Sequence, residues 1–308
     1  MTVKTDQKKQ IIETQPEVMT GFKQTKGSWA KFIESYADVP EVFKPFFDPL
    51  EKAGRAMPHT VTTPTYEGYI QKTRQKLVCD LDNELYILTK QGDTYQTMVF
   101  PFKDVQLIEV NSVLLDTILT ICGDTKFGGR ATAYLRFNAT SEPLFNPFIH
   151  KIRSSFSTEK QVEKSDQFLD LAKANYKLSS FARSSLLNGE KVYEIVLQPE
   201  IRKNLLKHLT PHIHRTVFPA HVYLLTQHEF ILIRETDLQN RPDNYGGIWD
   251  YAQLSHIKTM SISECSDGLL KFTVALNDGP ALETRFQPAL RPQIEQMIDQ
   301  FKALTAKA

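Results

Sequence analysis

The chain has 308 residues, with 37 basic and 36 acidic side chains and a formal net charge of +1. At about 150 residues per domain, this length predicts two domains, and a hydrophobic content of 41% is enough to give each a core. The balanced charge excludes a protein whose whole surface attracts nucleic acid. No apolar run reaches the roughly 18 residues of a membrane-spanning helix, and the Lys-rich start does not fit a signal peptide.

The three cysteines, Cys79, Cys122 and Cys265, are odd in number and widely separated. Such spacing is typical of reduced thiols rather than of a disulfide framework. The sequence therefore predicts a cytoplasmic protein.

Residues 1–58 are predicted to be a flexible tail followed by a helical extension. Residues 1–27 are rich in Lys, Gln and Thr and show no periodicity. Behind Ser28, apolar residues at helical spacing predict an amphipathic helix. These residues are Trp29, Phe32, Ile33 and Tyr36. Pro45 and Pro49 interrupt the next run, which predicts two short helical turns. We expect these aromatic side chains to pack on the following domain, and docking of a partner is the alternative.

Two β-rich domains, residues 59–157 and 183–308, are predicted to follow, joined by a helical linker over residues 158–182. The cluster Asp80-Leu81-Asp82-Asn83 predicts a turn between two strands, and Asn188-Gly189 predicts another. Each domain is expected to end in a helix.

The two β-rich segments resemble each other. Arg136-Phe137 corresponds to Arg285-Phe286, and Glu84-Leu85 to Glu229-Phe230. We also align Phe102, Val105 and Ile108 with Tyr251, Leu254 and Ile257. The closing helices share proline starts and one apolar face, at Pro143, Pro147, Ile149, Ile152 and Phe156 and at Pro288, Pro292, Ile294, Met297 and Phe301. A small sheet curled into a barrel and covered by such a helix would leave few open edges.

The second segment resembles a bacterial pleckstrin-homology-like (PH-like, GRAM-like) domain, and the first resembles it more weakly. The matching stretches are Leu186-Leu187-Asn188-Gly189-Glu190-Lys191-Val192, Tyr223-Leu224-Leu225-Thr226, Glu229-Phe230-Ile231-Leu232-Ile233, Trp249 to Ile257 and the closing helix. The resemblance implies an α+β, mainly β, fold of two β-barrels, each closed by a C-terminal helix. It also implies a binding or assembly module without enzymatic activity. The basic lipid-binding motif of eukaryotic PH domains has no match here.

Two basic patches are candidate sites for a ligand or an anionic surface. Residues 201–215 contain cations and no acid, and a second patch alternates along a predicted strand, which would place its members on one face. The patches are Arg202, Lys203, Lys207 and Arg215, and Lys72, Arg74 and Lys76. Four cations contribute at most about 4 kcal/mol near an anionic membrane, which corresponds to roughly millimolar affinity. A solvated face is the plainer interpretation, and nucleic acid is not an expected partner because neither patch contains an aromatic residue.

Metal binding has weak candidates in His208, His212 and His214, within a group of six histidines between residues 208 and 256. No Cys, Asp or Glu lies among these three, and Pro211 interrupts a helix there, so we expect no metal site. Asp80, Asp82 and Glu84 have the spacing of a calcium loop but lack its glycine, which favours a hairpin turn.

The sequence thus predicts a non-enzymatic binding or scaffold protein without a cofactor. Its partner would be another protein or a second copy of the chain, bound through the barrel surface and exposed strand edges. A peripheral membrane binder is the first alternative. A metal-dependent hydrolase built on the histidines between His208 and His256 is the second.

Overall fold

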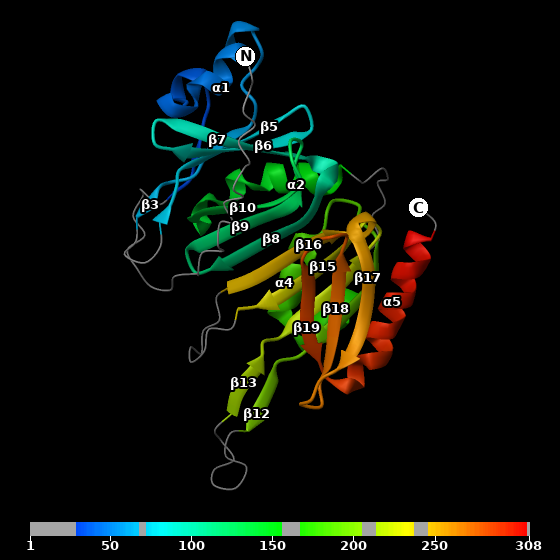
Figure 1. The fold of residues 1–308 in the computed structure, drawn as a ribbon. Coiled ribbons are helices and arrows are strands. Elements are labelled where there is room, and N and C mark those ends of the chain that lie inside the picture. The colour runs from blue at the N-terminus through cyan, green and yellow to red at the C-terminus, as the bar shows by residue number, and fades with distance from the viewer. Residues whose placement is uncertain (1–28, 68–71, 156–166, 205–213, 237–245, 307–308) are drawn as a thin grey trace.

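The protein is mainly β, with several antiparallel sheets and a smaller number of helices, as the computed structural model in Figure 1 shows. The structure describes residues 29–67, 72–155, 167–204, 214–236 and 246–306. Among these residues, no helix combines the length and the apolar character needed to cross a bilayer.

The strands of the first half are β1 (Lys31–Phe32), β2 (Thr60–Thr62), β3 (Tyr66–Glu67), β4 (Lys72–Thr73), β5 (Lys76–Leu81), β6 (Glu84–Gln91), β7 (Thr94–Pro101), β8 (Val105–Val113), β9 (Asp116–Asp124) and β10 (Arg130–Asn138). Those of the second half are β11 (Val192–Gln198), β12 (Ile201–Asn204), β13 (His214–Phe218), β14 (His221–Thr226), β15 (Glu229–Glu235), β16 (Gly246–Gln253), β17 (Ile257–Glu264), β18 (Leu270–Leu276) and β19 (Ala281–Phe286). The α-helices are α1 (Lys44–Lys52), α2 (Asn146–Ser154), α3 (Gln167–Ala174), α4 (Tyr176–Ser185) and α5 (Arg291–Thr305). The 3₁₀ helices are η2 (Tyr36–Asp38), η3 (Glu41–Phe43), η4 (Phe102–Asp104), η5 (Ala139–Leu144), η6 (Leu254–His256) and η7 (Pro288–Leu290).

Both halves follow the same order of elements. Each has a strand, a small hairpin, three further strands, a 3₁₀ turn, a three-stranded meander and a closing helix. In the first half these are β2, β3–β4, β5–β7, η4, β8–β10 and α2, and in the second they are β11, β12–β13, β14–β16, η6, β17–β19 and α5.

Corresponding backbone groups make the same hydrogen bonds in the two halves. The Phe102 N–H donates to the Asn83 carbonyl at 3.0 Å, and the Leu254 N–H donates to the His228 carbonyl at 2.9 Å. A register irregularity likewise follows Val105 in β8 and Ile257 in β17. By element order Phe102 and Val105 therefore correspond to Leu254 and Ile257, three residues beyond the sequence alignment, which was wrong in this stretch.

The expected closed barrels are not present among the described residues. In the first half, the four strands β2, β5, β6 and β7 form one layer, and β1 adds to it to give the five-stranded sheet β1-β2-β5-β6-β7. Its β8 then pairs with β16 of the second half, which creates one seven-stranded sheet in the order β10-β9-β8-β16-β15-β14-β11. Figure 1 shows β8 and β16 side by side where the halves meet. In a closed barrel, the edges of β8 and β16 would each pair with a strand of their own half. Here each edge pairs with the other half instead.

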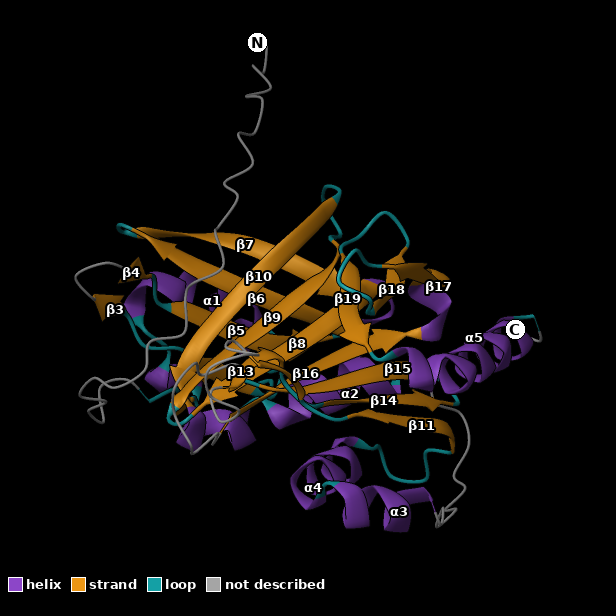
Figure 2. Ribbon diagram, turned by 90° about the horizontal axis from the view of Figure 1, so that it is seen from below, coloured by secondary structure: helices purple, strands orange, loops and turns teal. Residues whose placement is uncertain are grey.

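The seven-stranded sheet contributes apolar side chains to two cores. Figure 2 shows α3 and α4 beside β14 and β11 at one end of this sheet. One core contains side chains of the first half, of α3 and α4 and of one face of β14 to β16. The other lies between β14–β16, the sheet β17-β18-β19 and α5. The apolar faces of the closing helices are buried as expected at Ile149, Ile152, Ile294, Met297 and Phe301, and Phe156 lies outside the described residues.

The N-terminal extension differs from the predicted helices. Residues 31–32 form β1, which pairs with the edge of β2, and only a 3₁₀ turn follows at Tyr36. Hydrogen bonding to an open edge overrides the helical spacing here. Further along, α1 is one helix rather than two turns, because Pro45 lies in its first turn and Pro49 removes only one hydrogen bond. Two helices, α3 and α4, lie in the predicted linker, and α4 begins at the cap residue Asn175.

Candidate functional site

The junction between the halves begins at the β8–β16 ladder. Seven residue pairs run from Gly246 opposite Val113 to Ala252 opposite Leu107. A Cβ atom on Gly246 would lie 2.6 Å from the Ser112 carbonyl oxygen, so a side chain there would push the strands apart. The strands need a glycine at this point for close approach.

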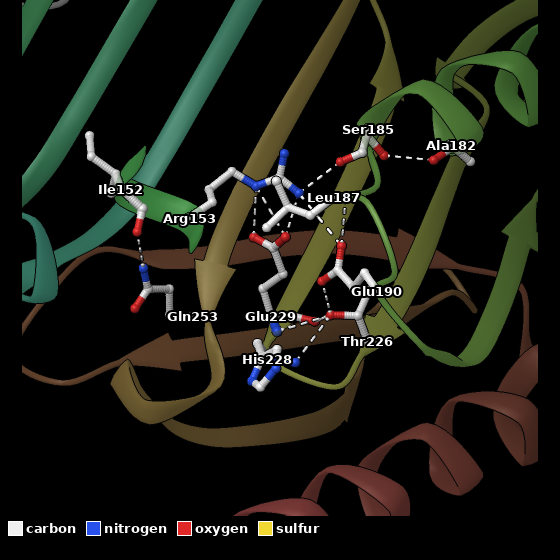
Figure 3. Close-up of polar contacts among 10 residues, drawn as sticks. All are labelled: Ile152, Arg153, Ala182, Ser185, Leu187, Glu190, Thr226, His228, Glu229 and Gln253. Carbon is white, nitrogen blue, oxygen red and sulfur yellow. Dashed lines mark hydrogen bonds and ion pairs between the residues drawn. The ribbon is translucent and has the colours of Figure 1, made fainter. Parts of the chain in front are cut away.

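A buried arginine crosses this junction. Arg153, in the last turn of α2, donates from Nε to both carboxylate oxygens of Glu229 in β15, each at 3.0 Å (Figure 3). Its Nη2 also donates to the Ser185 carbonyl at 2.7 Å, and its guanidinium lies 4.0 Å from the Tyr251 ring centroid. The Arg153 and Glu229 side chains are only 4% and 3% exposed. Helices α2 and α4 and strands β15 and β16 are therefore held by one guanidinium.

A second carboxylate, Glu190, lies beside this pair, 3.9 Å from Arg153 Nη2. It accepts hydrogen bonds from Thr226 Oγ1 at 2.5 Å and from the Leu187 N–H at 3.0 Å. Burial and then the negative charge of Glu229 raise the pKa of Glu190 to about 8. At neutral pH Glu190 is therefore largely protonated and lies beside the Arg153–Glu229 ion pair.

A second charged group lies within the ladder itself. Asp250 on β16 is directly opposite Glu109 on β8. Arg234 Nη2 lies 2.7 Å from Asp250 Oδ2 and 3.7 Å from Glu109 Oε2. Asp250 is completely buried, and this burial raises its pKa. Arg234 therefore binds Asp250 and lies beside Glu109, so it contacts side chains on strands of different halves.

Three buried side chains, His221, Tyr223 and Thr284, form a chain of hydrogen bonds in the second half. His221 Nε2 is 2.8 Å from the Tyr223 hydroxyl, which is 2.6 Å from Thr284 Oγ1. Burial lowers the pKa of His221 to about 4, so the ring is neutral at physiological pH. All three side chains are buried and join β14 to β19. Their bonds to one another fit a role in holding two sheets together.

The predicted basic residues are dispersed. Lys76 is buried and its Nζ donates to the Tyr134 carbonyl at 2.7 Å, so it does not belong to a charged surface. Strand β4 ends before Arg74 and β5 begins at Lys76, so the expected single face does not form. Arg202 is paired with Glu200, with Nη2 and Oε2 2.6 Å apart.

Lys203 and Arg215 lie on the β12–β13 hairpin, which projects from the second half in Figure 1. The strand register places Lys203 opposite Arg215. Lys207 lies outside the described residues, and the structure places Lys72 at the start of β4.

Neither proposed cation site is assembled in the described part of the chain. His208 and His212 lie outside it, and His214 begins β13. In that part of the chain, no group of three or more His, Cys, Asp or Glu side chains is placed to hold a metal ion. Asp82 and Asn83 instead have φ of 54° and 63° in the tight turn between β5 and β6, which confirms the hairpin. A hollow of about 390 Å³ beside this turn is lined by both Asp80 and Lys151, which form an ion pair.

Two exposed strand edges are candidate binding surfaces that the sequence motifs did not reveal. β7 and β17 are terminal strands of their sheets. Exposed side chains occur at Thr94, Gln96 and Thr97 of β7 and at alternate positions of β17, namely Thr259, Ser261 and Ser263. No protein-family model matches the chain, and no curated protein matches its sequence.

Proposed function

We propose that this chain is a non-enzymatic binding protein of two PH-like units, which acts by association through strand edges with a protein partner or with itself. The shared order of elements supports two PH-like units, each with a four-strand layer, a three-strand layer and a closing helix. The free thiols of Cys79, Cys122 and Cys265 fit a cytoplasmic location.

The edges of β7 and β17 carry this proposal. Unprotected edges offer backbone groups to another strand, and most proteins protect them with charges, proline or bulges. Residues 94–99 of β7 and 259–263 of β17 contain no charged residue and no proline. By contrast, the buried charges of the junction, such as Arg153 and Asp250, already bind one another. The exposed edges are therefore available to bind a partner, whereas the charged groups of the junction are occupied by one another.

The test is recovery of bound proteins by the tagged full chain from its native cell, identified by mass spectrometry. Ser261→Lys and Thr97→Lys place a charge on the two edges, and Thr132→Lys on β10 is the matched control. The proposal expects proteins that the wild type and the control recover and the edge variants lose. Identical recovery by all four chains would contradict it.

A further inference from the structure

The junction inside the chain shows how one half binds another. There β8 of the first half pairs with β16 of the second over seven residue pairs. By element order, the counterpart of β8 in the second half is β17, and the counterpart of β16 in the first half is β7. The chain therefore carries a second copy of each junction edge.

These second copies have no partner strand among the described residues. β7 ends the sheet β1-β2-β5-β6-β7, and β17 ends the sheet β17-β18-β19. Leu107 in β8 is buried, whereas its counterpart Thr259 in β17 is exposed. Asp250 in β16 is buried, whereas its counterpart Met98 in β7 is half-exposed.

The other long edges also carry charged residues. β10 has an arginine at Arg130 and another at Arg136, and β11 has Glu194 beside a register irregularity. β19 carries Glu283 and Arg285. β7 contains no charged residue, and the charges of β17, Lys258 and Glu264, lie near its two ends and leave residues 259–263 uncharged. β7 and β17 are also the two strands whose counterparts are paired at the junction.

From this correspondence we infer that the occupant of these edges is a second copy of the chain, with β17 of one copy pairing antiparallel with β7 of the next. The inference rests on the proposed function and names its partner. Trp249 is opposite Val110 at the junction, and their counterparts are Thr97 and Ile262. Thr97 of one copy would therefore lie opposite Ile262 of its neighbour. The Val99 carbonyl already accepts the Lys126 N–H at 2.9 Å, so the new ladder covers Thr94–Met98.

This contact is heterologous, because two different edges meet. It generates a head-to-tail ring or filament rather than a two-fold dimer. It also lacks the buried arginine of the internal junction, since Ile298 in α5 corresponds to Arg153, and Glu84, the counterpart of Glu229, is bound to Lys126. Association is therefore weaker than the internal junction and depends on concentration.

The test is disulfide trapping between two full-length variants, Thr97→Cys and Ile262→Cys, each also carrying Cys265→Ser to remove the half-exposed native thiol. Opposed side chains of antiparallel strands lie within reach of a disulfide. Oxidation of the mixture is expected to give covalent dimers that neither variant forms alone. Thr97→Cys mixed with Tyr134→Cys on β10, where the opposite residue is Thr120 rather than a cysteine, is the control.

Trapping no greater than this control would overturn self-pairing, as would trapping within either variant alone. Sedimentation velocity supplies an independent reading, in which Ser261→Lys should weaken wild-type association by about tenfold or more because an ammonium is held at the joint. A wild type that remains monomeric as its concentration rises would also overturn the inference. In that case, edge-dependent recovery of other proteins would still support the proposed function.

Discussion

Arg153 and Glu229 lie far apart in the sequence, yet their side chains form a buried ion pair that joins the two halves of the chain. A buried pair of this kind contributes less net stability than its charges suggest, because both groups lose their water. Loss of one partner is costly, because the other charge is then buried alone. This asymmetry makes the pair a sensitive probe of the junction.

Arg153→Ala should lower the free energy of unfolding by about 3–5 kcal/mol. The cause is the uncompensated Glu229 carboxylate, together with lost packing on Tyr251. Urea titration followed by circular dichroism measures the change. Arg291→Ala, which removes an exposed arginine from α5, is the control and should have little effect. Equal effects of the two substitutions would show that the junction pair is not required.

Stability should fall as pH rises from about 6.5 to about 8. Burial raises the pKa of Glu190 in the folded chain to about 8. The stability that its proton contributes is fully present below the pKa of Glu190 in the unfolded chain, and it is lost as pH rises through the folded-state pKa. The slope is at most about 1.4 kcal/mol per pH unit. His221, with its pKa lowered to about 4, acts in the opposite direction but only below the ordinary histidine pKa. Glu190→Gln should flatten the profile between pH about 6.5 and 8, and an unchanged slope would contradict the assignment.

Phe301→Ala in α5 should cost about 3–5 kcal/mol, because the ring is a buried part of the second core. Lys302→Ala, at the adjacent exposed residue, is the control. Denaturant titration measures both. A loss below about 1 kcal/mol for Phe301→Ala would show that the closing helix is peripheral to the fold.

Anionic vesicles should bind the chain only weakly at about 0.15 M salt, where surface charges are screened beyond about 8 Å. The β12–β13 hairpin brings Lys203 opposite Arg215, but Arg202 is neutralised by Glu200 and Lys76 is buried. Co-sedimentation at low and high salt tests this. Strong binding at the higher salt that is lost on charge reversal of Lys203 and Arg215 would favour the membrane alternative.

Local patterns predicted the elements better than their partners. Alternating apolar residues and the Asp82-Asn83 turn gave the hairpin β5–β6, and proline-led apolar stripes gave α2 and α5. The helix predicted from the spacing of Trp29, Phe32 and Ile33 was wrong, because this segment pairs with the open edge of β2 as a strand. Such recruitment depends on residues distant in sequence, which a local period does not record.

The junction could not be found from the sequence for the same reason. Glu229 and Arg153 read as ordinary surface charges, and only the fold brings them together in a dry site. The pairing of β8 with β16 replaced the expected closed barrels, since either arrangement satisfies an edge strand and the sequence of one strand does not choose between them. The uncharged stretches 94–99 and 259–263 were visible in the sequence, but their meaning depends on knowing which strands end a sheet.

Hydrogen exchange tests the strand-edge account most directly. The full chain is compared alone at low concentration and in the complex recovered from its native cell, whether that complex contains further copies or another protein. The account predicts slower amide exchange in complex at Thr94–Met98 of β7 and at residues 259–264 of β17, with little change in the edge strand β10. Unchanged exchange at both β7 and β17 in a stable complex would contradict it.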